Sequence, residues 1–299
     1  MGRRVRHAVG AVMRLANLGG RAVLITGDRA LDVFDAGGFG PDPMAVLENW
    51  AAFTAWARSA PAGSPFDPAL LGPPVPRPRQ VFAVALNYPP HAAEAGFEPP
   101  ADPLVFTKFP TCIAGPQETI ELPGDRVDWE VELVAVIGRG GHRIAETRAL
   151  DHVAGYTVGQ DLSERRVQAL GKPPQFSLAK SFPGFGPIGP KLVTEVAPDA
   201  AITCLLNDEV VQQASLADMI FGVPELVARL SAVCPLLPGD LIFTGTPAGV
   251  GNRRTPPRYL TAADVLTSRI DGLGELRTRF RATPPWTGAG RESTSRSVS

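Results

Sequence analysis

The alternation of hydrophobic and polar positions predicts a chain built mainly from strands. The most informative stretch runs from Asp128 to Gly138, where aliphatic and β-branched residues dominate and no Gly or Pro interrupts them. Successive strand side chains point to opposite faces, so Glu130 and Glu132 share a face, about 7 Å apart along the backbone. Such an apolar strand is usually buried, and buried carboxylates are costly unless a cation compensates. Two interpretations stay open: a bound divalent metal, or a strand end in water.

Short hydrophobic runs separated by turn residues fill most of the remaining chain. We expect further strands at 21–25, 31–34, 81–86, 104–108, 153–161, 202–206, 209–213, 241–244, 266–270 and 275–280. We expect helices at about 43–59, near 146–152, at 224–234, and at the start of the polar stretch 162–178, which continues as a loop. Many strands, few helices and no regular βαβ alternation indicate a β-rich α+β fold.

Composition along the chain predicts four parts. Residues 1–12 are expected to be a leader, and 13–75 a small N-terminal domain. A stiff proline-rich connector at 72–78 leads into a large domain at 76–283. The Gly-, Ser- and Arg-rich segment 284–299 is expected to be a disordered tail.

Total charge and cysteine usage narrow the class of protein. The 299 residues carry a formal net charge of −1, which gives no electrostatic argument for nucleic acid or an anionic membrane as partner. No apolar run approaches the length of a membrane span, and no signal peptide is evident. The 3 cysteines lack CxxC spacing, as in a reducing compartment. We therefore expect a cytoplasmic protein without nucleic-acid or membrane partners.

Asp161 extends the candidate carboxylate set. It ends the extended segment 155–160, and a strand terminus could aim it at Glu130 and Glu132. Three carboxylates with open positions suit a hard cation such as Mg²⁺ or Mn²⁺. Asp161 could instead cap a helix that begins at Leu162.

Three other motifs could contribute chemistry, and each has a plainer interpretation. Helical spacing places Glu94 beside His91, where a carboxylate can orient an imidazole that activates water, but the pair could also lie on a solvated helix face. The turn 245–251 could present N–H groups and the Thr246 hydroxyl to a small anion, or be only a tight turn. Lys180, in an apolar, strand-like setting, could donate to an enolate or be a surface lysine.

In this order, these motifs resemble the fumarylacetoacetate hydrolase family, which includes acylpyruvases, oxaloacetate decarboxylases and 2-oxo-dioate hydratase/isomerases. The resemblance covers roughly residues 80–281, and its matching stretches are 86–94, 128–133, 153–161, 178–182, 218–221 and 237–251. Residues 13–75 resemble the small N-terminal domain of bacterial members less distinctly. The sequence departs from the family pattern around the expected pocket, at 163–166 among other places, which bears on the identity of the substrate.

The resemblance implies a mixed β-roll catalytic domain, a homodimer, and one Mg²⁺ or Mn²⁺ per subunit. It implies that the metal ligands are Glu130, Glu132 and Asp161. It implies a water-activating dyad of His91 and Glu94, carried on a lid, and Lys180 as the residue that stabilises or protonates the enolate. The substrate-binding residues it implies are Arg165, Gln168, Gly245 and Thr246.

The function expected from the resemblance is hydrolysis of a C–C bond in a 1,3-dicarbonyl acid, such as an acylpyruvate or a fumarylacetoacetate-like acid. One alternative is a decarboxylase or an enol–keto isomerase or hydratase of 2-oxo acids such as oxaloacetate. A second alternative is a family relative without catalysis that binds a metabolite or has a structural role.

Overall fold

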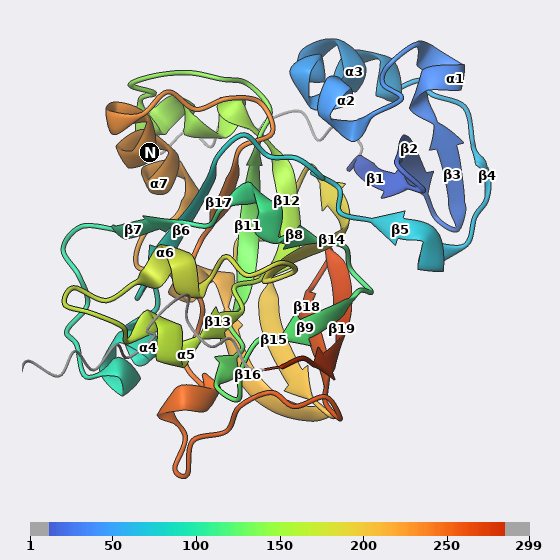
Figure 1. The fold of residues 1–299 in the computed structure, drawn as a ribbon. Coiled ribbons are helices and arrows are strands. Elements are labelled where there is room, and N and C mark those ends of the chain that lie inside the picture. Colours follow the sequence, from blue (N-terminus) through green and yellow to red (C-terminus); the bar gives the residue numbers. More distant parts are fainter. Residues whose placement is uncertain (1–11, 285–299) are drawn as a thin grey trace, which may run out of the picture.

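The computed structural model describes residues 12–284 and is drawn in Figure 1. The strands of its first and largest sheet are β1 (Arg14–Leu18), β2 (Arg21–Thr26), β3 (Arg29–Asp32), β4 (Ser64–Pro65), β5 (Leu71–Gly72), β6 (Val81–Ala85), β7 (Leu104–Thr107), β8 (Ile113–Ala114), β11 (Val131–Ile137), β12 (Val153–Gln160), β14 (Gly186–Val193) and β17 (Leu241–Phe243). They follow the order β4-β3-β2-β1-β14-β12-β11-β17-β6-β7, with β5 beside β1 and β8 beside β14.

Two further sheets complete the β-structure. The second sheet has the order β16-β15-β18-β19-β9 and consists of β9 (Thr119–Leu122), β15 (Ala201–Leu206), β16 (Glu209–Ser215), β18 (Val265–Ile270) and β19 (Gly274–Ala282). The third sheet pairs β10 (Val127–Asp128) with β13 (Ser163–Glu164). These mixed sheets with few helices confirm the predicted β-rich α+β class.

The helices are short. The α-helices are α1 (Val33–Gly37), α2 (Pro43–Glu48), α3 (Trp50–Ala57), α4 (Pro89–Ala95), α5 (Arg165–Gln168), α6 (Phe176–Ala179) and α7 (Val223–Val233). The 3₁₀ helices are η1 (Pro68–Leu70), η2 (Pro110–Cys112), η3 (Glu146–His152), η4 (Leu216–Asp218) and η5 (Gly251–Arg253). Across residues 12–284, no helix has the length and apolar character needed to cross a membrane.

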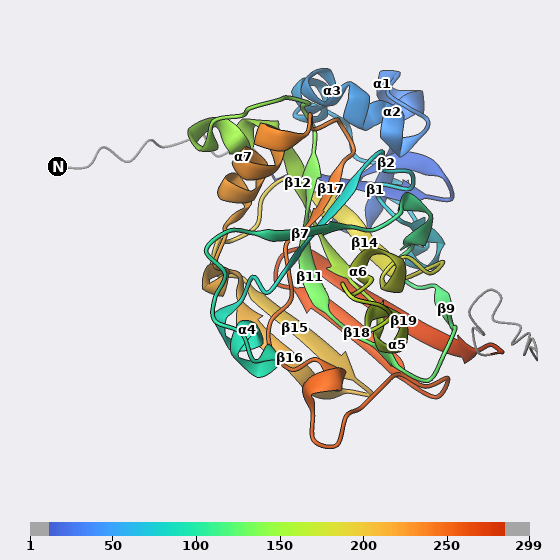
Figure 2. The same ribbon diagram turned by 60° about the vertical axis from the view of Figure 1, so that its left-hand side comes forward.

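Strand β11 lies at the centre of the molecule and is buried on both faces. One face, with Val131 and Leu133, belongs to the core cluster formed with the second sheet. The other face, with Val134 and Val136, belongs to the cluster that contains the N-terminal elements. Figure 2 shows β11 between these two parts. The site residues that β11 carries are therefore held from both sides.

The N-terminal elements continue the first sheet. Strand β1 pairs antiparallel with β14, and Leu15 lies opposite Leu192. In Figure 1 the blue elements form a lobe at the upper right that joins the rest of the molecule at this pairing. The division into domains at 13–75 and 76–283 remains a prediction, and the leader and tail at 1–12 and 284–299 fall almost wholly outside the described residues.

Local hydrogen bonds change several predicted elements. The single helix expected at 43–59 is two helices, α2 and α3, separated at Asn49, whose backbone leaves helical geometry. The strand expected at 31–34 ends at Asp32, because the Asp32 side chain accepts the N–H groups of Phe34 and Asp35 and starts α1 instead. The expected helix near 146–152 is the 3₁₀ helix η3.

The predicted central strand is also interrupted. The chain pairs with β13 as β10, leaves the sheet at Trp129 and Glu130, and enters β11 at Val131. Side chains replace the strand ladder at this break. Gln160 Oε1 accepts the N–H of Glu130 at 2.8 Å, and Gln212 Oε1 accepts the N–H of Val131 at 3.0 Å. Glu130 therefore lies outside the regular strand, but its carboxylate still lies near that of Glu132.

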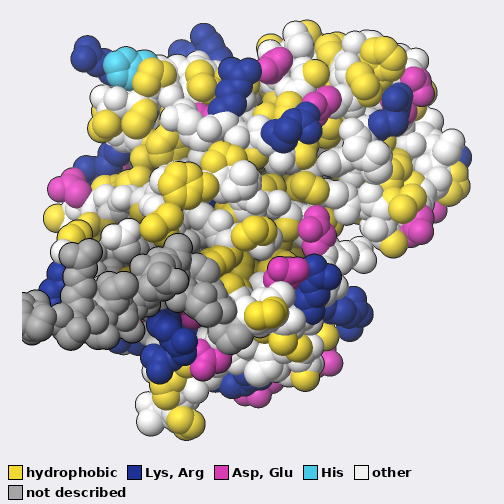
Figure 3. All heavy atoms as spheres, in the orientation of Figure 1, with side chains coloured by type: hydrophobic (Ala, Val, Ile, Leu, Met, Phe, Trp, Pro, Cys, Tyr) yellow, Lys and Arg dark blue, Asp and Glu magenta, His cyan; other side chains and the backbone are white. Residues whose placement is uncertain are grey.

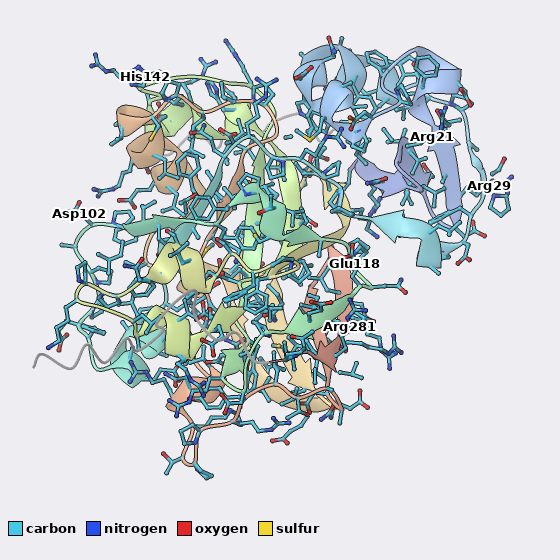
Figure 4. All side chains as sticks on the ribbon, in the orientation of Figure 1. Arg21, Arg29, Asp102, Glu118, His142 and Arg281 are labelled. Atoms are coloured by element: carbon cyan, nitrogen blue, oxygen red, sulfur yellow. The ribbon has the colours of Figure 1, made fainter. Side chains whose placement is uncertain are left out.

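The surface carries both signs of charge. On the face drawn in Figure 3, basic and acidic side chains of the described residues are interspersed with hydrophobic ones. Arg29, labelled in Figure 4, lies on β3 and donates to the carbonyl of Gly63 at 2.7 Å.

Candidate active site and metal centre

The structure brings the three predicted metal ligands together. Strand pairing sets Glu132 opposite Gly159, and the N–H of Asp161 donates to the carbonyl of Glu130 at 2.9 Å. One carboxylate oxygen from each of Glu130, Glu132 and Asp161 lies within 4.8 Å of the other two. All three side chains are buried, so the alternative of two glutamates in water does not apply. Nor does Asp161 act as a helix cap, because β13 follows it.

Two of these carboxylates are held by cations. Lys180 Nζ donates to Glu130 Oε2 at 2.7 Å and to Asp161 Oδ2 at 2.6 Å, and Arg165 contacts Glu130 Oε1 at 2.6 Å. Burial opposes ionisation of Glu130, but the charges of Lys180 and Arg165 outweigh it and lower its pKa to about 2. Glu130 is therefore ionised at neutral pH.

Glu132 is the exception. Its Oε2 accepts the N–H of Gly245 at 2.8 Å, and no lysine or arginine pairs with it within residues 12–284. Burial, and then the charges of Asp161 and Glu130, raise the pKa of Glu132 well above its usual value. A carboxylate with this environment needs a further positive charge to remain ionised.

The charges around the site fit a divalent cation. Four buried carboxylates, Asp128, Glu130, Glu132 and Asp161, face two buried lysines, Lys108 and Lys180, and the partly exposed Arg165. One negative charge is left over, and it lies on the oxygen donors that hard cations prefer. Glu130, Glu132 and Asp161 could thus hold a divalent metal, as the donor set predicted.

Lys180 is not in a strand, as its apolar flanks had suggested. It follows the last residue of α6 and takes the C-cap position, where φ is −107° and ψ is 8°. Lys180 is 2% exposed, which excludes the surface-lysine alternative. Burial alone would lower the pKa of Lys180, but Asp161 and Glu130 raise it, so the ammonium stays charged.

Lys108 is a site residue that sequence reasoning missed. Its fully buried ammonium donates to Asp161 Oδ1 at 2.7 Å, to the carbonyl of Phe185 at 3.2 Å, and to the carbonyl of Lys180. It therefore orients Asp161 and fixes the backbone at Lys180. The usable signal was the scarcity of lysine in the chain, which made a lysine at the end of the strand predicted at 104–108 informative.

The predicted His–Glu dyad is formed on α4. His91 Nδ1 lies 2.8 Å from Glu94 Oε1, and both side chains are mostly buried rather than on a solvated helix face. Glu94 also accepts the N–H of Gly249 at 3.0 Å, which fastens α4 to the glycine-rich turn. In the neutral tautomer that donates Nδ1–H to Glu94, Nε2 of His91 is the ring nitrogen that can accept a proton.

The glycine-rich turn supports the site in a different way from that expected. Thr246 Oγ1 donates to the carbonyl of Val131 at 2.9 Å and accepts from Gln212 Nε2 at 2.8 Å. The Gly245 N–H is used by Glu132. Gly245 also has a φ of +94°, which favours glycine. Both residues therefore brace β11, and their predicted contact with substrate remains a prediction.

Arg165 and Gln168 lie side by side on α5, with Arg165 Nη1 donating to Gln168 Oε1 at 3.0 Å. The guanidinium of Arg165 is also bound by Asp128, which the sequence reasoning left without a role. Asp128 further accepts the N–H groups of Gly251 and Asn252 and so ties the end of the glycine-rich turn to Arg165. The predicted substrate role of Arg165 and Gln168 stays a prediction.

A cavity of about 750 Å³ opens beside these groups. Its polar lining includes His91, Glu130, Arg165, Gln168, Lys180 and Thr246. Most other lining residues are apolar, and several of these come from β6, β7, α4 and α6. The structure therefore places the dyad, one metal-site carboxylate and the lysine around one space that a small molecule can enter.

A buried carboxylate cluster that opens into such a cavity, on mixed sheets with few helices, defines an enzyme-type site on a β-rich fold. The fumarylacetoacetate (FAA) hydrolase C-terminal family matches residues 80–281, and the chain belongs to this family. The family resemblance inferred from the sequence is thus confirmed.

Similar proteins extend this assignment. A crystal structure from Mycobacterium smegmatis is 51% identical, covers 91% of this chain and 100% of its own, and superposes with a TM-score of 0.87. The maleylpyruvate hydrolase from Sphingobium sp. SYK-6, solved with manganese(II) and pyruvate, is 28% identical over 90% of this chain and 99% of its own, with a TM-score of 0.74. The mitochondrial oxaloacetate tautomerase FAHD2A of Bos taurus is 43% identical over 68% of this chain and 67% of its own. The chain spans about two thirds of the length of the curated relatives it matches.

Proposed function

We propose that this protein is a metal-dependent hydrolase that cleaves a C–C bond in a 1,3-dicarbonyl acid. The observation that carries the proposal is the His91–Glu94 pair at 2.8 Å, with His91 lining the same cavity as Glu130 and Lys180. Hydrolysis needs a base that activates water, and a histidine oriented by a carboxylate meets that need.

The chain's own residues supply binding, proton transfer and charge stabilisation. A divalent cation held by Glu130, Glu132 and Asp161 would supply Lewis-acid polarisation of the 2-oxo acid end. His91 Nε2 takes a proton from water, whose oxygen forms a bond to the carbonyl carbon distant from the carboxylate. The C–C bond then breaks, and its electron pair forms the enolate of the 2-oxo acid fragment. The Lys180 ammonium offsets this charge, and protonation of the enolate completes the two acid products.

A second candidate is enol–keto tautomerisation of a 2-oxo diacid. It is supported by the curated relatives at 41–43% identity that are named oxaloacetate tautomerases. Proton transfer between carbon and oxygen would use His91 and Lys180 without attack by water. The products separate the two reactions, because hydrolysis yields two acids and tautomerisation yields one.

Two further properties belong to the proposal. We infer one Mg²⁺ or Mn²⁺ per subunit, supported by the carboxylate donors and by the manganese(II) of the maleylpyruvate hydrolase neighbour. We also infer a homodimer, which rests on the family resemblance.

His91→Ala tests the proposal. We expect a loss of about 10²- to 10⁴-fold in kcat on acylpyruvates, assayed with Mg²⁺ or Mn²⁺, with metal affinity unchanged because His91 is not a ligand. His142→Ala is the matched control, since His142 is exposed and does not line the cavity. Figure 4 shows it at the top of the molecule. Unchanged turnover in His91→Ala would exclude the dyad as the base.

A further inference from the structure

The cavity has an apolar wall beside the reactive groups that a small diacid would leave uncovered. Four exposed large hydrophobic residues line it: Phe97 at 60%, Leu104 at 49%, Val105 at 46% and Phe176 at 38% exposure. Apolar side chains gathered at one concave surface mark a binding site more often than chance exposure does. We name Phe97, Leu104, Val105, Phe106 and Phe176 the apolar wall.

The apolar wall begins next to the reacting groups. Lys180 Nζ lies 5.0 Å from the centre of the Phe106 ring, and the Phe106 and Phe176 rings lie 5.8 Å apart at 32°. An acid with its 2-oxo end near Lys180 would thus place its next substituent directly against two aromatic rings. Aromatic faces of this kind favour a flat, apolar group.

Helix α4 and the residue that follows its cap contribute both His91 and one residue of the apolar wall. Gly96 ends α4 in left-handed geometry, and the N–H of Phe97 then donates to the carbonyl of Ala92 at 2.9 Å. His91 and Phe97 are therefore fixed by the same short helix. Glu94 fastens α4 to Gly249, so the cavity keeps its volume of about 750 Å³ with α4 bound to the glycine-rich turn.

The volume of the cavity agrees with a large substituent. Cavities of about 300–1,000 Å³ are typical for drug-sized ligands, and this one is about 750 Å³. A four-carbon diacid such as oxaloacetate would fill only a small part of it. The remaining surface would stay hydrated and apolar, which is unfavourable.

We propose that the substrate is a 2-oxo acid whose far end carries a bulky apolar group, preferably an aryl ring, bound by the apolar wall. Phe106 and Phe176 are the specificity-determining residues. This inference rests on the proposed function for the acid end of the substrate. Two arginines of the cavity lining, Arg126 and Arg253, set up the competing possibility that a second carboxylate binds there, because neither forms an ion pair with another residue in 12–284.

The test compares three 2-oxo acids that lack the second carbonyl and cannot be cleaved. 2-Oxobutanoate, 2-oxo-4-phenylbutanoate and 2-oxohexanedioate are titrated into the full-length protein in Mg²⁺ buffer, and Kd is measured by calorimetry. Burial of the ring should make the phenyl acid bind about 10- to 100-fold more tightly than 2-oxobutanoate. Equal affinities, or tighter binding of the diacid through Arg126 and Arg253, would overturn the proposal.

Phe176→Ala should reduce the preference for the phenyl acid by about three- to tenfold, since the variant removes one of the two rings. Leu178→Ala is the matched control, because Leu178 is on the same helix, is 54% exposed and does not line the cavity. Phe97→Ala, at a more exposed position, repeats the test if Phe176→Ala does not fold. Equal losses in Phe176→Ala and Leu178→Ala would also overturn the proposal.

Turnover separates this inference from the proposed function. Benzoylpyruvate and acetylpyruvate are assayed with the same proteins, and we expect Phe176→Ala to lower kcat/KM for the aryl substrate selectively. If the phenyl acid binds preferentially but neither substrate is cleaved, the hydrolase proposal fails and the apolar wall stands. If both are cleaved with equal kcat/KM and bound without preference, the apolar wall fails and the hydrolase proposal stands.

Discussion

Within residues 12–284, Glu132 differs from Glu130 and Asp161 in forming no ion pair with a lysine or arginine. Because burial, Asp161 and Glu130 disfavour its ionised form, the metal-free protein carries a cost at this residue that a bound divalent cation would remove. Glu132→Gln should therefore leave the metal-free protein as stable as the wild type, or more stable. The same change should abolish stabilisation by Mg²⁺ or Mn²⁺, which reaches about 2.7 kcal/mol at a metal concentration of 100 Kd.

Thermal unfolding with chelator and with added metal measures both effects of Glu132→Gln. Glu275→Gln serves as the control, because Glu275 is an exposed strand residue. A metal-dependent rise in Tm of wild-type size in Glu132→Gln would remove Glu132 from the ligand set. Loss of the rise in both variants would point to a general effect of charge.

Lys108 should matter more for stability than any surface ion pair. Lys108→Met would leave Asp161 Oδ1 and the carbonyls of Lys180 and Phe185 without their donor in a buried site. Breaking a buried pair from one side costs about 3–5 kcal/mol. Chemical denaturation should show a loss of this size, and metal affinity should fall because Asp161 loses its orientation. Lys191→Met, at a half-buried position away from the site, should change stability by far less.

At the scale of elements, the sequence located strands better than their ends. The Asp128–Gly138 stretch identified the central strand because its apolar residues are needed on both faces. It could not reveal the break at Trp129 and Glu130, because the groups that replace the ladder there, Gln160 and Gln212, are distant in sequence. Helix ends set by side chains, such as the Asp32 cap, were missed for a similar reason.

The same limit applies to the site residues: contacts between residues close in sequence could be predicted, and contacts between distant residues could not. His91 and Glu94 are three residues apart on one helix, so local spacing was sufficient to predict their contact. Lys180 was correctly expected to be near the site, but the strand-like setting predicted for it was wrong. It follows α6, and this helix is too short to give a periodic pattern. Lys108 reaches Asp161 across 53 positions, and nothing local indicates such a contact.

The turn before β17 carries a prediction about pH. Asp240 accepts the backbone N–H groups of Gln80 and Leu237 and so joins the start of β6 to this turn. Burial nevertheless raises its pKa to about 6 from an unfolded value near 3.8. A raised folded pKa gives stability that is present below the unfolded pKa and lost as pH rises through the folded one. We expect the unfolding free energy of wild type, relative to Asp240→Asn, to fall by about 2–3 kcal/mol between pH 4 and pH 7.

Denaturant titrations of the two proteins at several pH values check this. The difference in unfolding free energy between wild type and Asp240→Asn cancels the contributions of all other titrating groups that the two proteins share. A relative stability that is flat, or that rises with pH, would show that the two backbone donors outweigh burial at Asp240. Asp271→Asn, at an exposed turn, should show no comparable pH dependence.

At the scale of the whole molecule, the site is assembled by both core clusters. Strand β11 brings Glu132 to the site, and its two faces are packed by different parts of the chain. The N-terminal elements, although distant from the cavity, support one of those faces through residues such as Leu15 and Phe53. The small N-terminal domain expected at 13–75 stays a prediction, and a pattern of strands alone could not show that β1 would join the edge of β14.

A chain that starts at Pro76 should therefore fail to form the stable site. It would lose β1, expose the edge of β14 at Leu192 and Val193, and uncover Val134 and Val136 behind the metal ligands. A typical domain is stable by only about 5–15 kcal/mol, so uncovering these core residues should remove a large part of that margin. We expect aggregation or a broad, metal-insensitive unfolding transition by circular dichroism. A milder change, Leu15→Ala in the full chain, should cost about 2–5 kcal/mol and lower the temperature to which metal protects the protein. If the shortened chain unfolded cooperatively and bound metal with wild-type affinity, the site would depend on the residues after Pro76 alone, and 13–75 would be an independent domain.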